Sequence, residues 1–169
     1  MHHTRLTLLL AMLAVAVAGC HGYSYTLNER EIFSPPTLFS DYQLADRALQ
    51  DCVQQAIEDQ SITEPGQLKD LNCSKAGISS LAGIGVFSGL VRVGLDGNAL
   101  ASVAPLAALK QLDLLQVRDN RLAGFEPALC GKPGRKLALA GNTAFRCEDL
   151  ERLRNCEVTL VDQPAHCPG

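Results

Sequence analysis

The chain has 169 residues with a net charge of −3 at neutral pH, and 47% of the residues are hydrophobic. This length fits one domain. Because the basic residues are scattered and form no cluster, we expect no nucleic-acid partner.

Residues 1–19 have the pattern of a lipoprotein signal peptide. Arg5 precedes an unbroken apolar run over 8–18, which is too short to span a bilayer that needs about 20 helical residues. The segment ends in VAGC at Cys20, which resembles the lipobox of bacterial lipoproteins. The resemblance implies acylation of Cys20 and anchoring in the bacterial cell envelope. Since His21 is not aspartate, it also implies the outer membrane. The alternative is an ordinary signal peptide.

Residues 20–40 contain paired prolines and no sustained period, so we predict a lipidated N-terminus and a flexible tether. The aromatic residues of this segment are expected to lie near the membrane or to fold back on the domain, rather than to form a binding motif. They are Tyr23, Tyr25, Phe33 and Phe39.

Residues 41–66 predict an N-terminal helical cap. Ser40 or Asp41 can cap a helix, and apolar pairs then recur four residues apart. Cys52 lies within this apolar stripe. A stack of repeats needs such a cap, because its first unit otherwise exposes an apolar end.

Residues 67–145 carry an apolar ladder with a period of 22 residues. The columns align without gaps as Leu68, Leu71, Cys73 and Ile78; Leu90, Val93, Leu95 and Leu100; Leu112, Leu115, Val117 and Leu122. A fourth, weaker rung continues at Leu137 and Leu139. A period of this size predicts one stacked architecture, which favours binding over catalysis.

An asparagine column follows the predicted strands at Asn98, Asn120 and Asn142, with Ala76 in the first rung. A buried amide there can satisfy backbone groups of neighbouring turns. The segments ISSLAGIGVFSGL and LASVAPLAALKQL resemble internalin-type leucine-rich repeats. Over residues 41–145 the resemblance implies an α/β repeat fold, a short right-handed solenoid with a parallel sheet on its concave face.

Residues 146–169 predict a disulfide-bonded C-terminal cap. A short helix is expected over 146–155, and Val158 and Leu160 alternate as a possible fifth strand roughly one period after Leu137 and Leu139.

Six cysteines besides Cys20 favour disulfides in an exported chain. Cys52 and Cys73 both face the core, so we pair them first. The remaining four allow three pairings. Of these we favour Cys147 with Cys167, which follow adjacent strands at similar distances, and this leaves Cys130 with Cys156.

We expect neither a metal nor an enzyme. The cysteines lack zinc-site spacing, and the chain after residue 19 holds only His21 and His166. His166 is expected to be an exposed tail residue. The glycines at 83–85 lie on a return path, and no nucleophile or phosphate-binding motif occurs. We therefore expect no cofactor.

Strand alternation predicts the solvent-facing side of the sheet. Its expected members are Asp70, Asn72, Ser74, Arg92, Gly94, Asp96, Leu114, Gln116, Arg118, Lys136, Ala138 and Ala140. Within this face we predict a protein-binding patch formed by Arg92, Asp96, Gln116 and Arg118, because arginine is enriched at binding hot spots. The equally weighted alternative is a solvated face with cross-strand ion pairs.

The expected function is protein–protein interaction at the envelope by a monomer anchored to the membrane through Cys20. One alternative is a structural or accessory subunit in envelope assembly. Another is binding of polysaccharide or peptidoglycan, which the scarcity of aromatic residues, 5% of the chain, disfavours.

Overall fold

The computed structural model describes residues 25–27 and 30–168, so the predicted signal peptide and Cys20 lie outside the described residues. The chain divides into two compact units, residues 1–37 and 38–169. In the first unit, β1 (Tyr25–Leu27) and β2 (Arg30–Phe33) form an antiparallel pair. The flexible tether predicted here therefore contains a two-stranded sheet, for which its aromatic and β-branched residues are suited.

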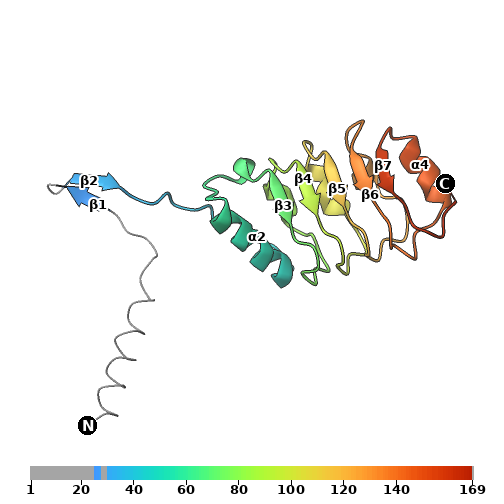
Figure 1. The fold of residues 1–169 in the computed structure, drawn as a ribbon, viewed down its shortest axis with the longest axis horizontal. Helices are drawn as coiled ribbons and strands as arrows, with labels where there is room; N and C mark the ends of the chain where they lie inside the picture. The colour runs from blue at the N-terminus through green and yellow to red at the C-terminus, as the bar shows by residue number, and fades with distance from the viewer. Residues whose placement is uncertain (1–24, 28–29, 169) are drawn as a thin grey trace, which may run out of the picture. The chain divides into compact units, whose positions relative to one another are not determined.

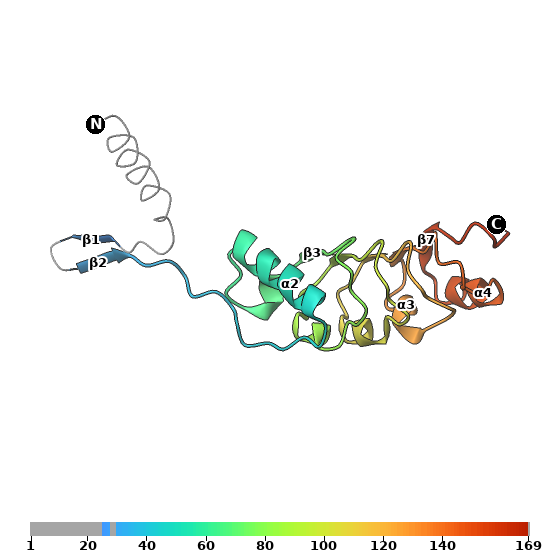
Figure 2. The same ribbon diagram turned by 90° about the horizontal axis from the view of Figure 1, so that it is seen from below.

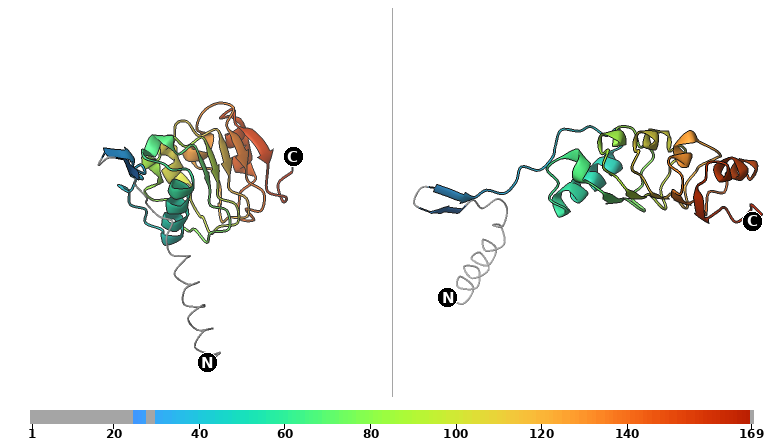
Figure 3. Two further views of the ribbon diagram at one scale, coloured as in Figure 1. Left: turned by 60° about the vertical axis from the view of Figure 1, so that its left-hand side comes forward. Right: turned by 90° about the horizontal axis from the view of Figure 1, so that it is seen from above.

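The second unit is built on a five-stranded parallel sheet whose strands follow chain order (Figure 1). The strands are β3 (Asp70–Asn72), β4 (Arg92–Gly94), β5 (Leu114–Gln116), β6 (Lys136–Ala138) and β7 (Thr159–Asp162). Helical segments connect successive strands, so the unit belongs to the α/β class. Figure 3 shows the strands side by side from two further directions.

Successive strands pair in the 22-residue register of the ladder. Leu71 pairs with Val93, Val93 with Leu115, and Leu115 with Leu137. All four residues are at most 3% exposed, so the inward direction predicted for them is confirmed. The fifth strand is also present, but Leu160 pairs with Leu137 rather than aligning with Leu139, because the chain between β6 and β7 no longer keeps the period.

Helical connections lie on the side of this unit opposite the strands (Figure 2). They are η1 (Pro65–Gln67), η2 (Ile84–Val86), η3 (Ala104–Ala108), α3 (Pro127–Cys130) and α4 (Glu148–Arg154). Among their residues, Ile84, Leu106 and Leu129 are at most 1% exposed and close the core between the two sides. The predicted short C-terminal helix is α4.

Helix α2 (Arg47–Asp59) lies beside β3 at one end of the sheet (Figure 1). Its stripe of Leu49, Val53 and Ile57 is completely buried, as expected for a cap. The helix begins later than Ser40 or Asp41 predicted, because its N-cap is Asp46. Residues 41–45 are not helical, and the N–H of Ala45 donates to the carbonyl of Ala82.

Asp46 also joins this helix to the first return path. One carboxylate oxygen accepts from the N–H of Leu49, and the other accepts from Ser79 and Ser80. Burial raises the pKa of Asp46, but the hydrogen bonds from Ser79, Leu49 and Ser80 outweigh burial and lower the pKa from 3.8 to about 2. The ionised form is therefore favoured by folding.

We expect protonation of Asp46 to make the protein less stable in acid. A carboxyl with a lowered folded pKa stabilises the fold above its unfolded pKa of about 3.9, and this stabilisation is lost as the pH falls towards 2. In Asp46→Asn the decrease in unfolding free energy between about pH 4 and pH 2 should be smaller by about 2 kcal/mol. Urea denaturation at a series of pH values measures this difference. The prediction would be contradicted if the unfolding free energy of Asp46→Asn and of the unmodified protein fell in parallel with pH.

The asparagine column is present as predicted and bridges neighbouring turns. The Oδ1 atoms of Asn98, Asn120 and Asn142 accept from backbone N–H groups of the preceding connection at 2.9–3.1 Å. Each Nδ2 donates to two backbone carbonyls. The residue before each column position has positive φ, which glycine adopts at Gly97 and Gly141 without the cost of a side chain.

Three disulfide bonds join the expected partners. Cys52 is bonded to Cys73, with Cα atoms 5.9 Å apart. The other bonds join Cys130 to Cys156 and Cys147 to Cys167. The first links α2 to the residue after β3, and the other two link α4 and its flanks to the preceding connection and to the C-terminal tail.

Candidate functional site

A groove of about 560 Å³ lies between helix α2 and the open face of strands β3, β4 and β5. We call it the cap groove. Its polar lining comes from Gln55, Asp59 and Gln60 of the helix and from Asp70, Asn72, Arg92 and Gln116 of the strands. It combines side chains of the helix with side chains of the sheet face, so it is the first candidate for binding.

The helical wall of the cap groove is polar because α2 is amphipathic. While the opposite stripe is buried, Gln55 and Asp59 are exposed one turn apart, and Nε2 of Gln55 donates to Oδ1 of Asp59 at 2.8 Å. Gln60 reaches the sheet, where its Nε2 donates to the carbonyl of Asp70 at 3.2 Å. The Cys52–Cys73 disulfide fixes this wall to the sheet beside the groove.

Arg92 and Asp70 form an ion pair across β3 and β4. Nε of Arg92 lies 2.5 Å from one carboxylate oxygen, and Nη2 donates to the other at 2.6 Å. The side chains remain 60% and 47% exposed, so the pair contributes at most about 1 kcal/mol to stability. This arginine lines the cap groove with its charge already balanced.

Arg118 is part of a separate network at the carboxyl ends of the strands. It pairs with Asp96 at 3.0 Å and with Asp162 at 2.6 Å. The hydrogen bond that Arg118 donates to Asp162 is the main cause of a raised pKa for Arg118. Burial raises the pKa of Asp162, but hydrogen bonds from Ala140, Arg118 and Leu139 together lower it below its usual range. The network stabilises the sheet edge.

The four residues of the predicted patch therefore divide into two pairs. Arg92 and Gln116 line the cap groove, whereas Asp96 and Arg118 do not. Cross-strand ion pairs, the alternative interpretation, involve both arginines.

The sheet face also differs from the prediction at its small residues. Gly94 and Ala138, which were expected to face solvent, are buried. At Gly94 the reason is local, because a Cβ atom would lie only 2.9 Å from Oδ1 of Asn72. The binding surface predicted from the sequence also omitted Gln55, Asp59 and Gln60. The polar stripe of α2, opposite its apolar stripe, is the sequence pattern that indicates them.

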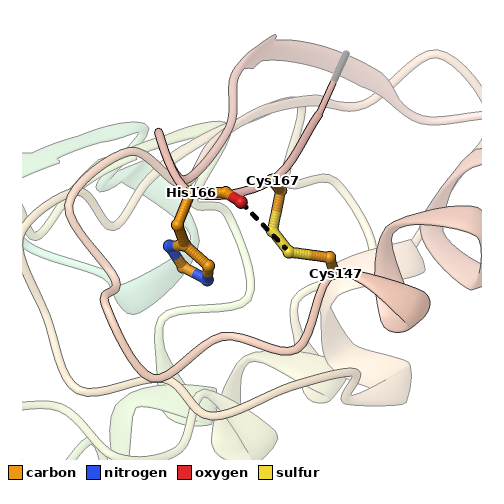
Figure 4. Close-up of side chains that lie close together, drawn as sticks. All are labelled: Cys147, His166 and Cys167. Atoms are coloured by element: carbon orange, nitrogen blue, oxygen red, sulfur yellow. Dashed lines mark hydrogen bonds between the residues drawn. A yellow bond between two sulfur atoms is a disulfide. The ribbon is translucent and has the colours of Figure 1, made fainter.

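A second cluster, Cys147, His166 and Cys167, brings three potential metal ligands within 4.8 Å of one another (Figure 4). The two sulfur atoms are joined in a disulfide, so neither is available as a thiolate ligand. His166 is exposed, and its Nε2 lies 2.7 Å from the carbonyl of Phe145. In this state the cluster fastens the C-terminal tail and holds no metal-binding thiolate.

Comparison of the chain with protein-family models and with curated proteins found no match. Within residues 25–27 and 30–168, no helix has the length and apolar character required to cross a bilayer.

Proposed function

We propose that the chain is a bacterial envelope lipoprotein, anchored through Cys20, whose leucine-rich repeat domain binds another protein in the cap groove. The domain would be a short right-handed solenoid with residues 41–66 as its N-terminal cap and 146–169 as its C-terminal cap. The observation that carries the binding function is the groove itself, an open hollow of mixed polar and apolar lining between the cap helix and the parallel sheet.

The leucine-rich repeat assignment is supported by three features that share one period. The strands pair at 22-residue offsets, the inward leucine and valine columns are buried, and the asparagine column bonds each turn to its neighbour. Repeats of this kind use their extended sheet face for recognition.

A protein partner fits the groove because carboxamide side chains project from both of its walls. Gln116, Gln55 and Gln60 can donate to and accept from a peptide backbone, which carries one donor and one acceptor in most residues. The charged residues Arg92 and Asp70 are already paired with each other. A binding role is also supported over catalysis, since no nucleophile paired with a base lines the groove.

Site-specific photo-crosslinking in intact cells tests this function. A crosslinker placed at Gln116, in the groove, should yield a discrete protein adduct, whereas one at the exposed Gln111, outside the groove, should not. In Gln116→Trp the bulky ring should occlude the groove and reduce capture from a second groove position, Gln55, at least fivefold. Gln111→Trp is the matched control.

The other outcomes separate the alternatives. Capture that persists in Gln116→Trp would indicate an accessory subunit that uses another surface, and capture of glycan without protein would favour polysaccharide or peptidoglycan binding. The anchor is tested separately. Cys20→Ser should move the protein from the membrane fraction to the soluble fraction, because stable anchoring requires the acyl chains.

A further inference from the structure

A buried arginine interrupts the apolar core on the helical side of the second unit. Leu68, Leu90 and Leu112 form one completely buried column, but the next position of the period is Gly134. The adjacent residue, Arg135, is buried instead and is only 1% exposed. Its aliphatic stem supplies the apolar volume that the column requires, and its guanidinium brings a positive charge into the core.

The guanidinium of Arg135 is held by backbone carbonyls. Nε donates to Leu112 at 3.0 Å, Nη1 to Ala128 at 2.6 Å, and Nη2 to Leu109 at 3.5 Å. A guanidinium has five N–H donors, so within the described chain one N–H on each terminal nitrogen remains beyond these bonds. Burial lowers the pKa of Arg135, while the charge of Asp113 opposes that shift. Asp113 itself pairs with Lys132, with Nζ and Oδ1 3.0 Å apart.

A hollow of about 360 Å³ is lined by residues of η3 and α3 and by Arg135. Its walls are mainly apolar and include Ala107, Leu109 and Pro127, whereas Lys110 and Lys132 supply positive charge. Nζ of Lys110 donates only to the carbonyl of Ala107 among the described residues. Arg135, Lys110 and Lys132 thus place three positive charges around one apolar hollow. Of these three side chains, Lys132 forms an ion pair with a carboxylate, that of Asp113.

We propose that this hollow, the Arg135 pocket, binds a carboxylate joined to a short apolar group. The two remaining N–H groups of Arg135 would donate to the carboxylate oxygens, since a guanidinium presents its donors in a fork that matches a carboxylate. The apolar group would lie against Ala107, Leu109 and Pro127. A chain-terminal residue and a short fatty acid share this chemistry. The site is independent of the cap groove, which lies on the sheet side.

NMR titration of the ¹⁵N-labelled protein with sodium hexanoate tests the proposal. Saturable shifts are expected for the backbone amides of Gly131 and Lys132 and for the side-chain Nε–H of Arg135. The neutral analogue hexanamide should shift them at least tenfold less at equal concentration, because a hydrogen bond to a charged group contributes more than a neutral one. The absence of saturable shifts up to about 10 mM, in the weak range for a specific ligand, would overturn the proposal.

Two pairs of matched variants locate the site. Ala107→Leu fills the pocket and should abolish the shifts, whereas Ala104→Leu, also exposed in η3 but outside the pocket, should leave them unchanged. Lys110→Gln should weaken hexanoate binding about fivefold, and Lys69→Gln should not. Three results would each overturn the assignment. They are equal shifts with hexanamide and hexanoate, equal effects of the two variants in either matched pair, and saturation by inorganic phosphate but not by hexanoate. A short peptide compared with hexanoate then distinguishes a chain terminus from a fatty acid.

Discussion

Replacing Asn142 by alanine should lower the unfolding free energy by about 3 kcal/mol, since each unsatisfied buried backbone group costs about 1–3 kcal/mol. Asn142 is completely buried. Its Oδ1 accepts from the N–H of Leu122 at 3.1 Å, and its Nδ2 donates to the carbonyls of Val117 and Leu139 at 2.9 and 2.8 Å. Alanine leaves the N–H of Leu122 and the carbonyl of Val117 without this partner, whereas the carbonyl of Leu139 keeps only the 3.4 Å bond from the backbone N–H of residue 142.

Chemical denaturation followed by circular dichroism measures this loss. Asn72→Ala is the matched control, because Asn72 is exposed and, among the residues that the structure describes, its Oδ1 accepts only from the nearby Ser74. That control should lose less than about 1 kcal/mol. Equal losses in the two variants would mean that the asparagine column contributes no more than a surface residue does, and would remove one support for the leucine-rich repeat assignment.

The parts of the fold that repeat were predictable from the sequence, whereas the parts that occur once were not. Leu71, Val93 and Leu115 occupy equivalent positions, so each supports the interpretation of the others. The start of α2 has no such redundancy. Ser40, Asp41 and Asp46 can all cap a helix, and the choice depends on Ser79 and Ser80, more than 30 residues away, which bond to Asp46.

The candidate site was predictable only in part, for a related reason. Alternation along β5 correctly directs Gln116 to the open face, because the direction of a strand residue follows from its position alone. The ion pairs of Arg118 with Asp96 and Asp162 depend on the register of three strands, and the pairing of β7 departs from the 22-residue period. The cap groove depends in addition on where α2 is held against the sheet.

The Cys52–Cys73 disulfide is one of the links that hold α2 in that position, and its removal is therefore expected to affect both stability and binding. In the double variant Cys52→Ala, Cys73→Ala the unfolding free energy should fall by about 3 kcal/mol, the typical contribution of a bond that closes a loop of this length. The buried stripe of Leu49, Val53 and Ile57 still packs on the core, so the folded state should persist.

Binding should decrease by more than the loss of stability explains. The polar wall formed by Gln55, Asp59 and Gln60 belongs to α2, and without the disulfide the helix can shift against β3 and change the width of the cap groove. Photo-crosslinking from Gln116 should therefore fall at least fivefold at temperatures where circular dichroism shows the double variant folded. The Cys130→Ala, Cys156→Ala variant is the control, because it should lose similar stability and retain capture. Equal capture by both variants would show that α2 does not form part of the binding site.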